Sequence, residues 1–287
     1  MKSGILINSY RLPLESSLLE AKRTGVDGIQ LYAIGKNYDL MKFSSTELDR
    51  LRNSAGQLKL GISALCAELG GHGFQLAAEN PEKIARTKRI IDIARFLGAP
   101  VITTHIGVVP ENSSDPVYRV MIEAMSELGA YAADRQVAIG IETGPESPEA
   151  LREFLRRTDG AVGVNLDPAN LLMVRNCDPV EAIHTLADSI VYAHFKDGLH
   201  YRDCDPVRVY TAFAEGGFPQ LQAETGKLFE ETAPGKGGVD FRGCLEAFRQ
   251  TGYDYYFTVE REGGDSPVAE VNAAASYLKQ LLEEFAS

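Results

Sequence analysis

Short apolar runs alternate along the chain with longer amphipathic segments. The runs are rich in β-branched residues and lack a regular in–out alternation. Strands that are buried on both faces have this pattern, which is typical of a parallel sheet covered by helices. The expected strands span residues 5–7, 28–32, 60–65, 101–104, 137–141, 162–166, 190–193 and 255–259.

The segments between these strands carry helix signals. Pro81 stands near the start of one expected helix and Gly98 follows its end, as is common at helix termini. Glu47 is placed to form a capping box with Ser44 or Ser45. The expected helices span residues 14–25, 44–56, 81–97, 115–135, 148–157, 178–187 and 267–284.

Eight strand–helix units follow one another, and no part of the chain has the different composition that would suggest a second domain. This pattern predicts an α/β fold, a single (β/α)8 TIM barrel over residues 1–287. The length suits this fold, which commonly takes about 250 residues. An open doubly wound sheet is the alternative. That fold normally has a Gly-rich phosphate turn after its first strand, and residues 8–11, Asn-Ser-Tyr-Arg, do not form one.

The interval between the seventh and eighth strands is too long for one helix. Residues 199–239 are rich in Gly, Pro, Asp and aromatic side chains. We expect a long inserted loop with some helix over the mouth of the barrel, because long loops often serve as lids. An oligomer contact or a plain insertion remains open.

Composition narrows the class of protein. The net charge of −11 argues against a nucleic-acid partner, since such proteins usually present a basic face. Four cysteines without a Cys-x-x-Cys pair indicate neither a disulfide framework nor a structural zinc site. No run of about 18 apolar residues predicts a membrane span, and the N-terminus does not resemble a signal peptide. We therefore expect a cytoplasmic protein.

Polar side chains directly follow the later strands: His105, Glu142, Asp167, His194 and Glu260. Active sites of these barrels lie at the carboxyl ends of the strands. Any one of these residues could be a helix cap or a salt-bridge partner, but converging carboxylates repel unless a cation or protons hold them. Three carboxylates and one imidazole suit Mn²⁺, Mg²⁺ or Co²⁺, and also allow Zn²⁺. The sequence thus predicts one metal site formed by Glu142, Asp167, His194 and Glu260.

Several motifs occur in the order known from one family. They are Ile141-Glu142, Asn165-Leu166-Asp167-Pro168-Ala169-Asn170, Ala193-His194-Phe195-Lys196-Asp197, Val259-Glu260, and the Gly-rich segment from Pro234 to Phe241. Together they resemble the xylose-isomerase-like barrel superfamily of sugar isomerases and epimerases, over nearly the whole chain.

The resemblance implies a function. In that family the matched Glu, Asp, His and Glu bind one divalent metal, for which we expect Mn²⁺ first. In its ketose 3-epimerases, glutamates at positions like Glu142 and Glu260 also exchange the substrate proton through a metal-stabilised enediolate. The resemblance also places substrate-binding residues at His72, His105, Asn170 and Lys196. It implies a sugar or keto-sugar substrate and a homo-oligomer, a dimer or tetramer.

Other activities fit the same residues. A lyase or dehydratase of a keto-sugar or keto-inositol would share the metal and the enediolate. A trinuclear zinc endonuclease of the superfamily is disfavoured by Asn170, where relatives carry histidine, by the missing Asp-x-His pair after the seventh strand, and by the net charge of −11. A non-catalytic sugar-binding barrel is a further alternative.

Overall fold

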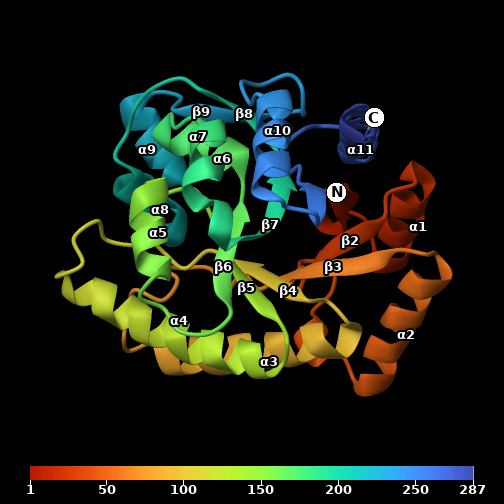
Figure 1. The fold of residues 1–287 in the computed structure, drawn as a ribbon, viewed down its shortest axis with the longest axis horizontal. Helices are drawn as coiled ribbons and strands as arrows, with labels where there is room; N and C mark the ends of the chain where they lie inside the picture. The colour runs from red at the N-terminus through yellow and green to blue at the C-terminus, as the bar shows by residue number, and fades with distance from the viewer. Residues whose placement is uncertain (287) are drawn as a thin grey trace.

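Eight parallel strands close into a barrel in the computed structural model, which describes residues 1–286 (Figure 1). The predicted domain of residues 1–287 therefore ends one residue beyond the described part. Around the barrel the strands follow the order β1-β10-β7-β6-β5-β4-β3-β2. Their bounds are β1 Lys2–Leu6, β2 Gly28–Tyr32, β3 Gly61–Cys66, β4 Val101–Thr104, β5 Ala138–Glu142, β6 Val162–Leu166, β7 Ile190–Phe195 and β10 Tyr256–Val259. The TIM barrel predicted from the sequence is confirmed.

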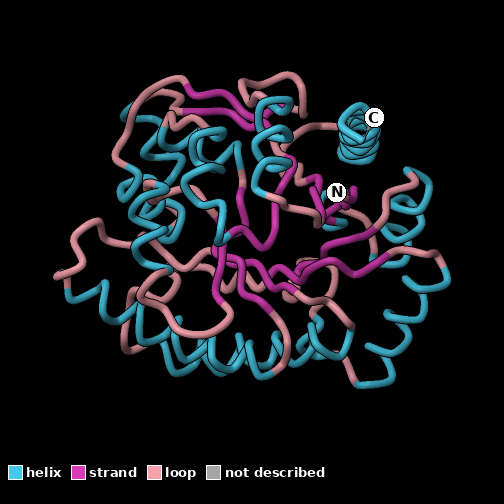
Figure 2. The backbone as a smooth tube through the Cα atoms, in the orientation of Figure 1, coloured by secondary structure: helices cyan, strands magenta, loops and turns pink. Residues whose placement is uncertain are grey.

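Helices surround the barrel on its outside, as Figure 2 shows with helices in cyan and strands in magenta. In chain order they are α1 Leu14–Thr24, α2 Ser45–Gln57, α3 Asn80–Leu97, α4 Pro116–Asp134, α5 Pro148–Leu155, α6 Pro168–Arg175, α7 Pro179–Leu186, α10 Phe241–Thr251 and α11 Pro267–Ala286. The capping box at the start of α2 is present, with Ser44 and Glu47 as its members.

Helix α6 was not expected from the sequence. It begins directly after Asp167, whose Oδ1 accepts a hydrogen bond of 2.9 Å from the backbone N–H of Asn170. Pro168 occupies the first turn of this helix, where its missing N–H costs nothing. Asp167 therefore has two tasks, because one carboxylate oxygen caps a helix and the other is left for the site.

The interior of the barrel contains hydroxyl groups as well as apolar side chains. The Tyr192 hydroxyl lies 2.6 Å from Ser63 Oγ and 2.6 Å from Thr258 Oγ1. All three residues are buried, and their mutual hydrogen bonds offset the cost of removing these groups from water.

The segment between β7 and the last strand is an ordered subassembly. Strands β8 Asp197–His200 and β9 Phe229–Thr232 form an antiparallel pair, and helices α8 Pro206–Glu215 and α9 Phe218–Thr225 lie between them in the chain (Figure 1). Phe213 stacks on Phe218 with ring centroids 4.2 Å apart. The predicted long loop is thus mostly regular structure, because its aromatic side chains pack with one another.

Asp197 ties this segment to the Gly-rich turn before α10. Its carboxylate accepts hydrogen bonds from the backbone N–H groups of Gly235, Gly237 and Val239, at 2.8, 2.8 and 3.1 Å. A Cβ at position 237 would overlap with that carboxylate. The turn therefore needs glycine at this position, and Asp197 has a structural role here.

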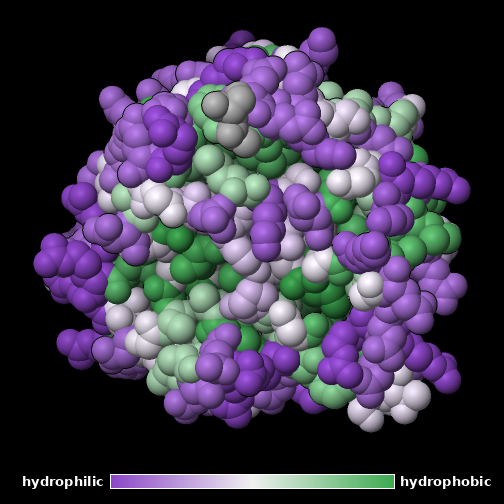
Figure 3. All heavy atoms as spheres, turned by 45° about the vertical axis from the view of Figure 1, so that its right-hand side comes forward, coloured by the Kyte–Doolittle hydropathy of each residue, from purple (hydrophilic) through white to green (hydrophobic). Residues whose placement is uncertain are grey.

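On the face drawn in Figure 3, hydrophilic side chains predominate and hydrophobic ones show between them. The four cysteines are free. Among the described helices, none is long and apolar enough to cross a membrane.

Candidate metal centre and active site

The four predicted ligands lie together at the carboxyl end of the barrel. Glu142 ends β5, Asp167 follows β6, His194 lies in β7 and Glu260 follows β10, and these strands are consecutive neighbours in the barrel. One ligand atom from each side chain lies within 4.8 Å of all the others, and all four residues are buried. Adjacent strands thus bring together side chains that are far apart in sequence.

His194 presents one ring nitrogen to the three carboxylates. Its Nδ1 lies 3.0 Å from Glu260, 3.4 Å from Asp167 and 3.6 Å from Glu142. On the other side of the ring, Nε2 donates a hydrogen bond of 3.0 Å to the side-chain carbonyl of Gln30. This bond leaves Nδ1 facing the carboxylates, the arrangement in which a histidine can bind a metal once that nitrogen loses its proton.

Asp167 provides the test of whether these residues fit a metal ion. Its Oδ2 is buried and has no hydrogen-bond partner, while Oδ1 caps α6. An unsatisfied buried carboxylate oxygen is costly unless a cation meets it. Carboxylate oxygens with one imidazole are also a common donor set for divalent first-row metals. The cluster therefore fits one divalent ion.

The buried charges of the cluster shift one another's pKa values. Burial acts to lower the pKa of His194, but the charges of Glu260 and Glu142 outweigh it and raise this pKa well above its ordinary value. For Glu142, burial acts to raise the pKa, whereas His105 and His194 lower it, and the net shift is downward. Both glutamates of the cluster are thereby held as carboxylates, the form that a metal ligand or a general base needs.

Two amides fix the orientation of Glu142. Asn170 donates a hydrogen bond of 3.0 Å to Glu142 Oε1, and Asn165 lies 3.3 Å from Glu142 Oε2. Asn170 is thus placed beside a ligand, at the edge of the cavity over the cluster.

Lys196 lies beside the other glutamate. Its ammonium is 3.2 Å from Glu260 and 3.4 Å from Glu262, and the residue is buried. Burial acts to lower the pKa of Lys196, but Glu260 and then Glu262 raise it above its ordinary value. The side chain therefore brings a fixed positive charge to the site.

His105 lies on the opposite side and is held by Glu68. The distance from His105 Nδ1 to Glu68 is 3.2 Å, and that from Nε2 to Glu142 is 3.9 Å. Burial acts to lower the pKa of His105, while Glu142 and Glu68 raise it to about 10. The two carboxylates thus favour the protonated form of this imidazole.

His72 is not part of this group. Its Nε2 lies 3.4 Å from Glu215 at the end of α8, and it lines a small cavity of about 30 Å³ that adjoins the site at His105 and Tyr210. The structure thus brings His105, Asn170 and Lys196 to the ligand cluster and leaves His72 as a contact between the loop after β3 and the inserted segment.

A cavity of about 350 Å³ lies over the cluster. Tyr210 and Phe213 of α8 and Phe229 of β9 form part of its wall, so the inserted segment borders the site. Tyr210 also lies beside His105, with ring centroids 5.7 Å apart. A cavity of this size, with an aromatic wall and a charged floor, can hold a small polar molecule.

Gln30 was missed in the sequence analysis. It is fully buried in β2 and also donates a hydrogen bond of 2.8 Å to Thr103. The only signal was a polar residue inside an apolar strand, Gly-Ile-Gln-Leu-Tyr. That pattern shows a buried amide but not which side chain it contacts across the barrel.

Fold and site together define a (β/α)8 barrel with a cluster of metal-ligating side chains at the ends of its strands. The family model of the xylose isomerase-like TIM barrel matches residues 18–281. The chain therefore belongs to this family, as the resemblance in sequence had indicated.

Two curated relatives match part of the chain. An uncharacterized protein of Methanocaldococcus jannaschii is 23% identical over 208 residues, which cover 68% of this chain and 62% of the relative. An inosose dehydratase of Geobacillus thermodenitrificans is 26% identical over 169 residues, which cover 58% of this chain and 53% of the relative. Each match thus spans less than two thirds of the relative's own length.

Solved structures share the fold over almost the whole chain. A xylose isomerase domain protein from Planctomyces limnophilus has a TM-score of 0.77 at 24% identity, covering 94% of this chain and 92% of that one. A D-tagatose 3-epimerase-like protein has a TM-score of 0.74 at 20% identity, covering 99% and 100%. A xylose isomerase-like TIM barrel protein from Mycobacterium smegmatis, in complex with magnesium, has a TM-score of 0.72 at 18% identity, covering 98% and 96%.

Proposed function

We propose that the protein is a divalent-metal-dependent isomerase or epimerase of a sugar or keto-sugar. The observation that carries this proposal is the buried cluster of three carboxylates around one imidazole nitrogen, with Asp167 Oδ2 lacking any other partner. Glu142, Asp167, His194 and Glu260 would hold the ion, for which we propose Mn²⁺ first. When bound, such an ion stabilises the negative charge that develops on the oxygens of a ketose as the neighbouring C–H proton leaves.

Proton transfer is assigned to the two glutamates. Glu142 and Glu260 extend from non-adjacent strands, with β6 and β7 between them, so they approach a bound sugar from different sides. Asn170 and Asn165 hold Glu142, and Lys196 holds Glu260. One carboxylate would remove the proton from one face of the sugar carbon and the other would return it on the opposite face.

Three further side chains would bind the substrate. Asn170, His105 and Lys196 line the cavity over the cluster and offer donors to sugar hydroxyls. His72 faces Glu215 instead, so a direct contact between His72 and the substrate would require this ion pair to open. Enclosure of the site would come from the inserted segment through Tyr210.

Elimination is the second candidate reaction. A dehydratase needs a proton donor for the departing hydroxyl group, and His105, with its pKa raised to about 10, is one beside Glu142. The relative from Geobacillus thermodenitrificans is an inosose dehydratase. Both reactions begin with removal of the same kind of proton, and only elimination loses a leaving group.

The decisive experiment follows solvent deuterium. The protein is saturated with Mn²⁺ and incubated in D₂O with a panel of free ketoses, keto-inositols and keto-glycosides, and the products are identified by NMR. Deuterium beside a carbonyl in an epimerised product supports the proposal, whereas an enone with ultraviolet absorption identifies the lyase. Absence of any metal-dependent exchange across the panel would contradict both reactions.

Glutamine variants then assign the bases. Glu142→Gln and Glu260→Gln keep the size and one oxygen of each side chain but remove its ability to take up a proton. Each should lower turnover by at least about 100-fold, and the surviving carboxylate should still exchange a proton on one face only. Glu146→Gln is the matched control, because Glu146 is a buried glutamate near the site but outside the cluster. Near-normal turnover of both test variants with metal bound would refute this assignment.

A further inference from the structure

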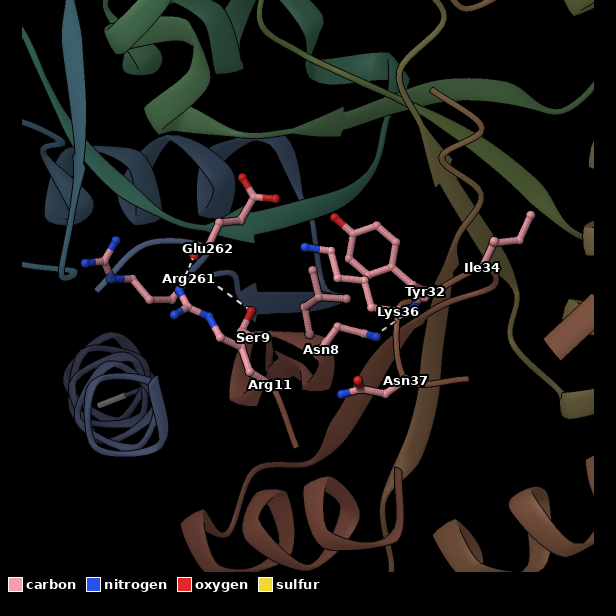
Figure 4. A pocket seen from close by; sticks show the side chains of 11 residues that line it. Asn8, Ser9, Arg11, Tyr32, Ile34, Lys36, Asn37, Arg261 and Glu262 are labelled. Carbon is pink, nitrogen blue, oxygen red and sulfur yellow. Dashed lines mark hydrogen bonds between the residues drawn. The ribbon is translucent and has the colours of Figure 1, made fainter. Parts of the chain in front are cut away.

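A second cavity, of about 480 Å³, opens at the carboxyl ends of β1, β2 and β10 (Figure 4). Tyr32 and Glu262 line both this cavity and the one over the ligand cluster. Glu262 stands two positions after the ligand Glu260 in the chain. The two cavities therefore adjoin at Tyr32 and Glu262.

The two arginines at the second cavity already have partners within the protein. Arg11 donates hydrogen bonds to three backbone carbonyls in residues 262–264. Arg261 pairs with Glu231 at 2.8 Å and with Glu270 at 2.9 Å. Two carboxylates thus neutralise Arg261, whereas Arg11 keeps its charge and is held in place by neutral carbonyl groups.

One ammonium and one carboxylate remain for a ligand. Lys36 is exposed, and its ammonium has no hydrogen bond or ion pair within the described residues. The Glu262 side chain is 59% exposed, and its one ion pair in this part of the structure, with Lys196, is long at 3.4 Å. The Glu262 carboxylate would repel a bound anion, and the Lys36 ammonium would repel a bound cation. A neutral molecule with many hydroxyl groups can donate to the carboxylate and accept from the ammonium.

The remaining wall suits such a molecule. Asn8 is fixed because its Oδ1 accepts hydrogen bonds from the Tyr32 backbone N–H at 2.9 Å and from the Tyr38 hydroxyl at 2.8 Å. Its amide nitrogen is left as a further donor at the cavity (Figure 4). The ring of Tyr32 adds a flat apolar surface for the C–H face of a sugar.

We propose that the second cavity binds a further sugar residue, so that the natural substrate is a keto-sugar joined to another sugar and not a free ketose. The position of the keto end rests on the proposed function. Binding of the attached residue does not depend on turnover, so it can be measured separately.

Isothermal titration calorimetry on the Mn²⁺-saturated protein tests this inference. The probes are D-fructose, a fructose monophosphate and three disaccharides that end in fructose. The disaccharides are turanose, maltulose and isomaltulose, which differ in the fructose hydroxyl that carries the glucosyl group. Two or three new hydrogen bonds should make at least one disaccharide bind about 10-fold or more tightly than fructose.

Lys36→Ala and Asn37→Trp, which remove the free ammonium and narrow the cavity, should abolish this gain and leave fructose binding unchanged. Lys42→Ala, an exposed lysine paired with Asp39 outside the cavity, is the matched control.

Several results would overturn the inference. They are equal affinity for fructose and every disaccharide, absence of binding by all probes, and a gain that survives in both variants. A gain shown only by a fructose monophosphate would assign the cavity to an anion and would also contradict the proposal. If a disaccharide binds through Lys36 but no probe is turned over, the inference stands and the proposed reaction fails.

Discussion

Gln30 accepts a hydrogen bond from His194 Nε2 across the interior of the barrel, at 3.0 Å. The two residues lie in β2 and β7, and 164 positions separate them in the chain. This bond fixes both the tautomer and the ring orientation of His194, with Nδ1 turned toward the three carboxylates. The orientation of His194, a proposed metal ligand, therefore depends on a residue outside the cluster.

Replacement of Gln30 by leucine should weaken metal binding. The variant keeps approximately the size of the side chain but leaves His194 Nε2 without an acceptor, and loss of such partners typically costs about 10- to 100-fold in metal affinity. Titration with Mn²⁺ in a calorimeter measures this change. Thr103→Val, which removes only the hydrogen bond between Gln30 and Thr103, should have a smaller effect. An unchanged Mn²⁺ affinity in Gln30→Leu would show that packing alone orients the imidazole.

Asp167→Asn should separate the two tasks of this side chain. Asparagine is as good an N-cap as aspartate, so the amide oxygen can still accept from the backbone N–H of Asn170, and α6 should remain folded. Its nitrogen would then replace Oδ2, which removes a negative ligand and should abolish stoichiometric Mn²⁺ binding. Asp178→Asn is the matched control, since Asp178 caps α7 in the same way but is not in the cluster. Retained binding of one ion per chain by Asp167→Asn would remove Asp167 from the ligand set.

Much of the fold, and the clustering of the four candidate ligands, could be predicted because both depend on local sequence signals. Buried parallel strands are continuous apolar runs, and the residue that ends each run faces the mouth of the barrel. This rule found Glu142, Asp167, His194 and Glu260 without any knowledge of distances. The rule did not identify Gln30, because a polar residue inside a strand gives no sequence signal for the side chain that it contacts on the far side of the barrel.

The helices and strand of the inserted segment could also not be predicted in detail from the sequence. Residues 199–239 combine two short helices and one strand of an antiparallel pair, and each is too short to give a clear periodic signal. Their structure depends on packing between distant aromatic side chains and on Asp197, which holds the Gly-rich turn. Helix α6 was also missed, although α5 and α7, which have the same length of eight residues, were predicted.

Substitutions of Gly144 and Tyr210 should have coupled effects on the packing of the inserted segment against the barrel. A Cβ at position 144 would overlap with the Tyr210 hydroxyl and lie 3.1 Å from the ring carbon that bears it. Gly144→Ala should therefore push α8 outward, increase amide exchange over residues 206–215 and reduce turnover. Addition of Tyr210→Phe removes the overlapping oxygen and should restore part of the protection.

The double-mutant cycle provides the control for this prediction. Exchange free energies of the wild type, both single variants and the double variant should give a coupling of at least about 0.5 kcal/mol. Additive effects of the two substitutions would mean that Gly144 is needed for another reason. Bound substrate should slow exchange in the same helix if the inserted segment acts as a lid.

Glu146 should make the stability of the protein depend on pH. The residue is 4% exposed, its Oε1 accepts a hydrogen bond of 3.0 Å from the Val109 N–H, and its Oε2 has no partner. Burial raises the pKa of Glu146 from 4.5 to about 7, although the Val109 hydrogen bond acts to lower it. Between these two pH values the folded state holds a proton that the unfolded state has released. The contribution of Glu146 to stability is therefore greatest below pH 4.5, falls as the pH rises to about 7, and is constant above that.

Glu146→Gln removes this dependence, because glutamine resembles the protonated acid at every pH and can keep the hydrogen bond from Val109. Relative to the wild type, the variant should gain stability as the pH rises, by about 2 kcal/mol between pH 5 and pH 8, as the shift in pKa implies. Urea unfolding at both pH values measures this difference. Glu153→Gln is the control, because Glu153 lies on the surface beside Arg157, which lowers its pKa, so that variant should not gain stability with rising pH. The difference in unfolding free energy between Glu146→Gln and the wild type could instead be the same at both pH values. Glu146 would then be ionised in the folded protein, and its Oε2 would need a further hydrogen-bond or ion-pair partner.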